Sequence, residues 1–432
     1  MTPLSAEDEV VELCQDLIRL DSTNAGDNAG PGERTIAEYV AEQLSAVGLE
    51  SRILESDDRR ASVVARIEGT DPGRDALLLH GHLDVVPFHA PDWAHHPLSG
   101  EIADGCVWGR GAVDMKDMDA MILAVVRQRL SQGRRPQRDL LLVFTADEEA
   151  GGHYGAQWLA EQHSELFEGV TEAIGEVGGF SISVSETQRL YLIEAAEKGI
   201  AWMKLTAAGR AGHGSMLNSD NAVTELAEAI GRLGRYQWPV RLTPTVVAFF
   251  REAFDIDLRS EDAEEAVAKL GPLARMIGAT LRNTANPTMF DAGYKANVIP
   301  QTATAHVDGR FLPGYEEEFF QTVDELLGPN VTREFVYHDV AVEAAFEGSL
   351  VAAMTRALTE EDPGARVVPY TLSGGTDLKA FSRLGIRGYG FAPLNLPPDL
   401  DFAGMFHGVD ERVPVDSLRF GVRVLDRFLD YC

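Results

Sequence analysis

Cysteine is scarce in this sequence, with only three among 432 residues. Cys14, Cys106 and Cys432 are too few and too widely spaced to predict a disulfide framework or a thiolate zinc site. Reduced, structural cysteines are typical of cytosolic proteins, so we expect a cytoplasmic protein.

Basic side chains are also in short supply. Lys and Arg number 38 against 68 Asp and Glu, which gives a formal net charge of −30. Such an excess of negative charge repels the phosphates of nucleic acids and of anionic membrane surfaces. We therefore expect neither nucleic acid nor a membrane among the partners.

Long apolar runs are missing as well. No stretch approaches the roughly 20 apolar residues that a membrane-spanning helix requires. The N-terminal region is acidic at Glu7, Asp8 and Glu9, so we expect no ordinary signal peptide. The 45% hydrophobic content still suffices for a large core.

What the sequence does contain is an alternation of strand and helix patterns. Apolar runs at 76–79 and 139–144 suit buried parallel strands, and 118–130 has helical character. This alternation predicts an α/β fold with a mainly parallel central sheet. After residue 198 the pattern changes, and 303–310 alternates as a half-solvated strand does. The predicted domains are one domain from residues 1–197 and 344–432, and an inserted α+β domain over 198–343.

Polar side chains follow several of the apolar strands. The groups His80-Gly81-His82, Glu148-Glu149 and Glu176 each follow one. Ligands of such sheets bind at the carboxyl ends of the strands, so we expect these side chains to meet at one edge. His82 and Asp84 share a face of an extended segment, so the Asp84 carboxylate can orient the imidazole. A polar strand end with hydrogen-bonded histidines is the alternative.

Two acidic positions also allow two interpretations. Asp114 lies in a glycine-rich loop before a helix, where it either binds a metal or caps the helix. Glu148 and Glu149 form a solvated turn, or they face a cavity where a metal relieves their repulsion and one acts as general base. With His407 added, the candidate ligands contain nitrogen and oxygen but no thiolate, which suits hydrolytic zinc. The candidate ligands are His82, Asp114, Glu149, Glu176 and His407.

In combination, these motifs are similar to one family. The chain resembles the co-catalytic zinc amidohydrolases and exopeptidases, which include aminoacylase, glutamate carboxypeptidase, acetylornithine deacetylase and succinyl-diaminopimelate desuccinylase. The matching stretches run in family order along nearly the whole chain. They are LLLHGHLDVVP (77–87), GRGAVDMKD (109–117), FTADEEAGG (144–152), AGHGS (211–215), NVIP (297–300), SGGTD (373–377) and MFHGVDE (405–411).

The resemblance implies two zinc ions per chain, which Co²⁺ or Mn²⁺ could replace. It assigns His82 and Glu176 to one ion, Glu149 and His407 to the other, and Asp114 to both. It also implies that Glu148 is the general base, that Asp84 orients His82, and that the Asp114-Met115 peptide is cis. On this basis, residues 1–197 and 344–432 form a zinc-peptidase catalytic domain.

The inserted domain would then be a lid that also forms a homodimer. His213 resembles the lid histidine that reaches a neighbouring subunit's site and stabilises the oxyanion, although a helix-capping loop fits the same residues. Asn297 resembles a lid asparagine that contacts substrate, or it is a turn residue. Arg310 has either a substrate role or an inter-strand ion pair. The lid stretch 231–286 is similar to that of the carboxypeptidase S-like and fatty-acyl amino acid hydrolase branch.

The loop 373–377, with Gly375 and Thr376, resembles the family's site for the substrate carboxylate. Lys379 stands where many relatives have arginine, and lysine cannot form the planar bidentate pair that arginine makes. Val177 is a second departure, because several relatives have glycine there.

The predicted function is hydrolysis of an amide bond in N-acyl amino acids or short peptides that carry a free carboxylate. One alternative is a dedicated biosynthetic deacylase of the desuccinylase or deacetylase type. Another is a catalytically silent relative that binds a metabolite or a partner.

Overall fold

The computed structural model describes residues 4–26, 28–185 and 188–432. The chain divides into two compact units, here called the main unit and the inserted unit. The main unit comprises Met1–Ala195, Phe346–Pro369 and Thr376–Cys432, and the inserted unit comprises Ala196–Ala345 and Tyr370–Gly375.

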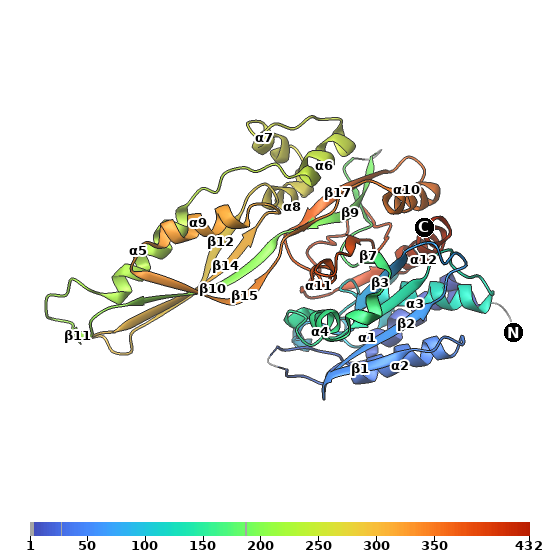
Figure 1. Ribbon diagram of the computed structural model, residues 1–432, viewed down its shortest axis with the longest axis horizontal. Helices are drawn as coiled ribbons and strands as arrows, with labels where there is room; N and C mark the ends of the chain where they lie inside the picture. Colours follow the sequence, from blue (N-terminus) through green and yellow to red (C-terminus); the bar gives the residue numbers. More distant parts are fainter. Residues whose placement is uncertain (1–3, 27, 186–187) are drawn as a thin grey trace. The chain divides into compact units, whose positions relative to one another are not determined.

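The main unit combines helices with short, largely buried strands (Figure 1). Its helices are α1 (Ala6–Arg19), α2 (Arg34–Ser45), α3 (Lys116–Ser131), α4 (Ala156–Gln162), α10 (Ser349–Glu361), α11 (Leu378–Ser382) and α12 (Val415–Tyr431). Its strands are β1 (Arg52–Asp57), β2 (Arg60–Ile67), β3 (Ala76–His82), β4 (Glu101–Ala103), β5 (Cys106–Trp108), β6 (Leu140–Thr145), β7 (Val170–Gly175), β8 (Phe180–Ser183), β18 (Arg387–Gly390) and β19 (Arg412–Pro414). Two further strands, β9 (Arg189–Glu197) and β17 (Arg366–Leu372), begin in this unit and end in the inserted unit.

The large sheet of this unit has the order β1-β2-β6-β3-β7-β18-β9. Its centre is parallel, because β6, β3, β7 and β18 run in the same direction. Antiparallel pairs flank that centre on both sides. Every residue of β3 and β6 is buried, as expected of strands covered on both faces. The predicted α/β fold with a mainly parallel central sheet is confirmed.

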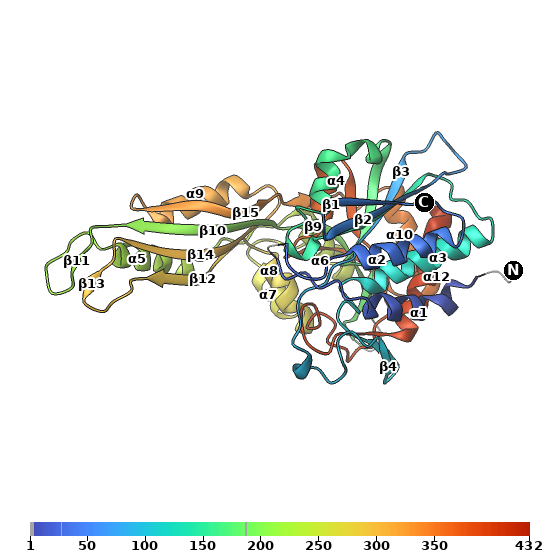
Figure 2. The ribbon, with the colours of Figure 1, turned by 90° about the horizontal axis from the view of Figure 1, so that it is seen from below.

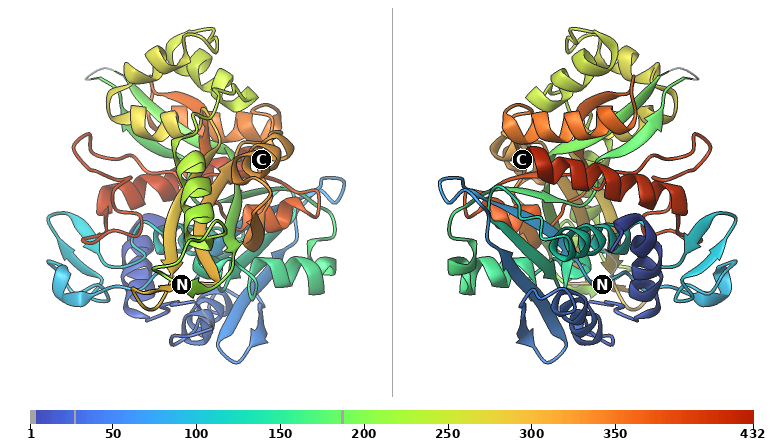
Figure 3. Two further views of the ribbon diagram at one scale, coloured as in Figure 1. Left: turned by 90° about the vertical axis from the view of Figure 1, so that its left-hand side faces the viewer. Right: turned by 90° about the vertical axis from the view of Figure 1, so that its right-hand side faces the viewer.

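Helices cover both faces of this sheet. On one face, α1, α3 and α12 contact one another, while α2 contacts β2 and α3 contacts β3 (Figure 2). The right-hand view of Figure 3 shows two helices of this face, α12 in red and α1 in dark blue. On the other face, Leu78, Leu141 and Val143 pack in one apolar cluster with residues of α4 and α11. The sheet thus forms the middle layer. Helices cover its two faces, so polar side chains can lie at the ends of its strands.

The inserted unit has an antiparallel sheet of its own. Its elements are β10 (Gly199–Ala208), β11 (Gly212–His213), α5 (Ala222–Arg235), α6 (Pro244–Phe254), α7 (Ala263–Ala268), α8 (Ala274–Ala279), β12 (Thr284–Ala292), β13 (Val298–Ile299), β14 (Thr302–Phe311), α9 (Glu316–Leu327), β15 (Val331–Asp339) and β16 (Val342–Glu343).

The main sheet of the inserted unit has the order β12-β14-β10-β15. Met203 and Leu205 of β10 lie in a buried cluster with residues of α5 and α9, which run along the sheet (Figure 1). Trp202 on the opposite face of β10 is exposed. The predicted alternation of β14 is confirmed, because its residues are buried at every second position.

In the part of the chain that the structure describes, every helix is too short or too polar to span a bilayer.

Candidate metal centre

Three parallel strands bring their following residues to one edge of the main sheet. β3 ends at His82, β6 ends three residues before Glu148, and β7 ends immediately before Glu176. His82 lies opposite Thr145 in the parallel ladder. Because the carboxyl ends of these strands coincide, the side chains that follow them converge, as the sequence predicts.

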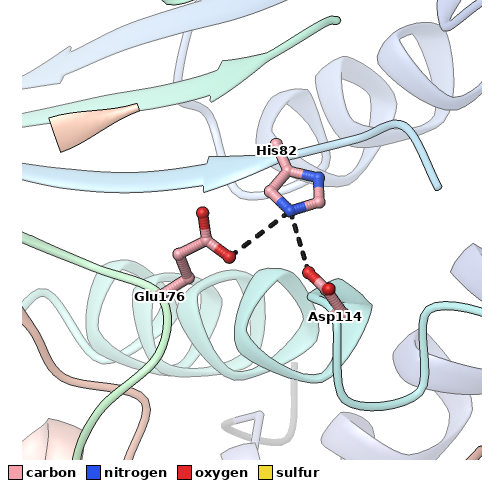
Figure 4. A group of neighbouring side chains, drawn as sticks. All are labelled: His82, Asp114 and Glu176. Atoms are coloured by element: carbon pink, nitrogen blue, oxygen red, sulfur yellow. Dashed lines mark hydrogen bonds and ion pairs between the residues drawn. The ribbon is translucent and has the colours of Figure 1, made fainter. Parts of the chain in front are cut away.

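The first candidate ligand group contains His82, Asp114 and Glu176 (Figure 4). The Nε2 atom of His82 lies 3.2 Å from Asp114 Oδ1 and 3.5 Å from Glu176 Oε2. In this group the ligand atoms lie within 4.8 Å of one another. That spacing suits ligands arranged around one small cation, for which metal–ligand distances are about 2.0–2.2 Å.

The second group contains Asp114, Glu149 and His407. The Nε2 atom of His407 lies 3.3 Å from Asp114 Oδ2 and 3.0 Å from Glu149 Oε2. Each oxygen of Asp114 therefore faces a different histidine. This geometry suits a carboxylate shared between two cations.

The electrostatics of these groups favour bound positive charge. Burial raises the pKa of Glu176 to about 7, and burial together with the charge of Asp114 raises the pKa of Glu149 to about 7. Hydrogen bonds to Asp114 and Glu149 raise the pKa of His407 to about 10. Burial opposes ionisation of Asp114, but its bonds with His407 and His82 outweigh burial and lower its pKa. The three carboxylates thus share only two imidazoles as cationic partners, those of His82 and His407.

Two buried oxygens in the site have no partner among the described residues. Oε1 of Glu149 and Oε1 of Glu176 make no hydrogen bond there. A buried carboxylate oxygen without a donor is costly unless something else binds it. The imidazoles and carboxylates offer the nitrogen and oxygen ligands of hydrolytic zinc, so the residues present fit a metal pair.

Asp84 holds the turn that carries Glu148 and Glu149. Its two carboxylate oxygens accept hydrogen bonds from the backbone N–H groups of Glu148 and Glu149, both at 3.1 Å. The Nδ1 atom of His82 lies 3.0 Å from the Asp84 carbonyl oxygen but 3.6 Å from its carboxylate. The backbone of Asp84 is therefore closer to the imidazole than the predicted carboxylate is.

Glu411, which is not among the predicted site residues, holds the loop that carries Asp114. Its carboxylate accepts hydrogen bonds from the backbone N–H groups of Gly111, Val113 and Asp114, at 3.0, 2.7 and 3.2 Å. It also forms a buried ion pair with Arg110 at 2.7 Å. Its place in the matched stretch 405–411 was the one available signal.

Asp114 does not cap the helix that follows it. The N-cap of α3 is Met115, and no side chain makes a capping hydrogen bond there. The peptide bond between Asp114 and Met115 is cis, as the family resemblance implies. The helix-cap interpretation is therefore wrong, and both oxygens of Asp114 face histidines instead.

The inserted unit brings two other predicted residues together. His213 pairs with Val298 in the β11–β13 ladder, and the N–H of Gly214 donates to the Asn297 carbonyl at 2.9 Å. The His213 ring is exposed, and its Nδ1 accepts the Ser215 N–H at 3.2 Å and lies 2.8 Å from the Ser215 hydroxyl. The residues around His213 do not cap a helix, because α5 begins later, at Ala222.

Arg310 is also on the inserted unit, where its guanidinium pairs with Asp308 of the same strand at 2.7 Å. The sequence predicts either a substrate role for Arg310 or an ion pair between two strands. The ion pair that the structure shows joins two residues of one strand, β14.

The predicted carboxylate loop leads into α11. The hydroxyl of Thr376 accepts a hydrogen bond from the N–H of Leu378 at 3.1 Å, and Gly375 is half-buried. Lys379 is only 1% exposed. Thr376 is also buried, at 6% exposed, so neither of these two predicted side chains is freely accessible. Val177 keeps the left-handed backbone with a φ of 53°, a conformation in which glycine is the usual residue.

Known proteins resemble this chain along most of its length. The model of peptidase family M20/M25/M40 matches residues 78–431. The N-fatty-acyl-amino acid synthase/hydrolase of Xenopus tropicalis is 28% identical over 90% of this chain and 79% of its own. Aminoacylase-1 of Sus scrofa is 27% identical over 90% of this chain and 88% of its own.

The solved structures show the same fold. An M20 family metallo-carboxypeptidase from Sulfolobus solfataricus superposes with a TM-score of 0.75 at 19% identity, covering 98% of this chain and 99% of its own. The family model spans most of the chain, and its matched region carries both candidate ligand groups. This protein therefore belongs to peptidase family M20/M25/M40.

Proposed function

We propose that this chain uses two zinc ions to hydrolyse an amide bond next to a free carboxylate, in N-acyl amino acids or short peptides. The observation that carries the proposal is the pair of ligand groups sharing Asp114, with Glu148 beside them. His82 and Glu176 would hold one ion, Glu149 and His407 the other, and Asp114 both. The main unit would be catalytic and the inserted unit a lid.

Glu148 would carry the proton through the reaction. When bound, the metal pair polarises the scissile carbonyl and acidifies water. Glu148 then takes a proton from the attacking water and delivers it to the leaving amine nitrogen. Its Oε2 atom lies 3.9 Å from His82 Nε2, and it belongs to neither ligand group. Burial and the charge of Glu176 raise its pKa, which strengthens it as a proton acceptor.

The relatives favour acyl amino acids as substrates. Two of them are named as an aminoacylase and as an N-fatty-acyl-amino acid synthase/hydrolase, at 27% and 28% identity. Gly375 and Thr376 would bind the substrate carboxylate, with Asn297, Arg310 and Lys379 as further substrate contacts. No described contact favours a dedicated biosynthetic deacylase. A silent relative is disfavoured because the five proposed ligands and Glu148 are all present in the sequence.

Removal of the metal should abolish activity. We expect the zinc- or cobalt-loaded protein to release amine from a panel of N-acyl amino acids and dipeptides, because the metals supply the electrophilic assistance. Treatment with a chelator should stop the release, and added metal should restore it. Amine release is followed with a primary-amine reagent. Release that persists after the metal content has fallen to background would contradict the proposed reaction.

We also propose a homodimer formed through the inserted unit, in which His213 acts in the neighbouring subunit's site. β12 and β15 are the outer strands of their sheet, and they expose Met289, Phe290 and Phe335. Apolar side chains on open sheet edges favour pairing with another chain.

A mixing experiment tests this role of His213. His213→Ala should lose turnover but keep its metal, because a hydrogen-bond donor to the oxyanion acts only in the transition state. Mixing inactive His213→Ala with inactive Glu148→Gln, under conditions that exchange subunits, should restore activity, since one site of each mixed dimer is intact. Light scattering gives the mass of each species. Wild-type rates for His213→Ala, or no recovery in demonstrated mixed dimers, would contradict the role.

A further inference from the structure

A buried polar network lies behind the Glu148-Glu149 turn, on the side of Asp84. We propose that Asn24 is a positioning residue that holds this turn through Asp84, an inference that rests on the proposed function of Glu148 and Glu149. Asn24 comes from the loop after α1 and is 3% exposed. It lies in neither candidate ligand group.

The orientation of the Asn24 amide is fixed by its partners. Its Oδ1 atom accepts hydrogen bonds from Arg60 Nη2 and from the Gly26 N–H, both at 3.0 Å. Because both of these partners only donate, the oxygen must face them and the amide nitrogen must face away. Arg60 is itself held by a buried ion pair with Glu33. The network thus sets the direction in which the Asn24 N–H groups point.

The Asn24 nitrogen bridges two buried carboxylates. Nδ2 donates to Asp84 Oδ2 at 2.9 Å and to Asp147 Oδ1 at 3.1 Å. An amide nitrogen has two hydrogens, so one group can supply both bonds. Asp84 and Asp147 are both nearly inaccessible to solvent. Without the bridge, two neighbouring buried charges would lose a common donor and would repel each other.

Of the two carboxylates that Asn24 bridges, Asp84 holds the turn directly and Asp147 flanks it. Asp84 accepts the N–H groups of Glu148 and Glu149, and Oδ2 is the atom shared by Asn24 and Glu149. Asp147 immediately precedes the turn and accepts the Tyr154 N–H at 3.0 Å. Movement of Asp84 would therefore displace the proposed base and a proposed ligand together. A continuous hydrogen-bonded path runs from Asn24 through Asp84 to the backbone of Glu148 and Glu149.

The test uses Asn24→Ala and Asn24→Asp in the full, metal-loaded chain. Both should lower kcat about 10- to 100-fold, the usual cost of losing an outer partner of a metal site. KM should stay within about twofold, because the substrate contacts remain. The visible spectrum of the cobalt-loaded protein should also shift, because Glu149 moves. Asn24→Asp keeps the size of the side chain and removes the amide donor, so it separates loss of the bridge from the lost volume of Asn24→Ala.

A matched control and a double-mutant cycle separate positioning from general stability. Asn28→Gly removes another amide that accepts from Arg60, through Nε at 2.9 Å, and Gly tolerates its φ of 53°. That variant should keep wild-type kcat.

In an Asp84→Asn background, adding Asn24→Ala should lower kcat little further, because both residues act through one path. Effects of Asn24→Ala and Asp84→Asn that multiply, or an unchanged cobalt spectrum and kcat, would overturn the inference.

The cobalt spectrum needs no substrate, so it separates this inference from the proposed reaction. An inactive wild type with an Asn24-dependent spectrum would overturn the reaction alone. An active wild type that tolerates both Asn24 variants would overturn the positioning role alone.

Discussion

Replacing Glu148 with glutamine should remove most of the turnover and leave the metal in place. Glutamine has nearly the same shape but cannot accept a proton, so only the proposed proton transfer is lost. Glu148 lies outside both ligand groups, although its Oε2 atom is 3.9 Å from His82 Nε2. General base catalysis contributes about 10²- to 10⁴-fold, and we expect kcat to fall by an amount in that range.

Glu149→Gln is the matched control for this experiment. The two acids are adjacent on one turn, and both are held by Asp84. Glu149 belongs to the second ligand group, so its replacement should lower the metal content as well as the rate. Metal analysis and steady-state kinetics on both variants give the comparison. Equal metal loss in Glu148→Gln would make Glu148 a ligand and would leave the reaction without its proposed base.

The local patterns were enough to predict which edge of the sheet carries the candidate ligands. The apolar run before His80-Gly81-His82, and the runs before Glu148 and Glu176, indicate parallel strands whose carboxyl ends coincide. The ladders confirm this arrangement. The strand period and the polar residue after each run are both local features of the sequence. The edge of the sheet that carries the candidate ligands could therefore be found without coordinates.

The supporting contacts could not be predicted in the same way, because they join residues far apart in the chain. Glu411 holds the Asp114 loop from 297 positions away, and Asn24 reaches Asp84 from another loop. Neither residue has a periodic signature, since each acts through one hydrogen-bonding side chain in an irregular segment. The carboxylate of Asp84 faces backbone N–H groups of the turn as well as the His82 imidazole. Which of these partners it contacts more closely depends on the geometry of the turn.

Replacing Asp114 with alanine should release metal from both sites. Its Oδ1 atom faces His82 and its Oδ2 atom faces His407, so one substitution removes an oxygen ligand from each group. The remaining ligands would then be one histidine and one carboxylate on either side, which is fewer than the three protein ligands usual for catalytic zinc. Turnover should fall with the metal content, as measured by metal analysis after dialysis.

Glu176→Ala is the control that distinguishes a shared ligand from an ordinary one. Glu176 belongs only to the group of His82, so its loss should weaken one site and leave the group of His407 complete. Cobalt titrations should therefore show one weakened site for Glu176→Ala and two for Asp114→Ala. A tight site of wild-type affinity in Asp114→Ala would mean that both oxygens of Asp114 serve the same cation in the wild type. The Glu149 oxygen that has no hydrogen-bond partner among the described residues would then need another explanation.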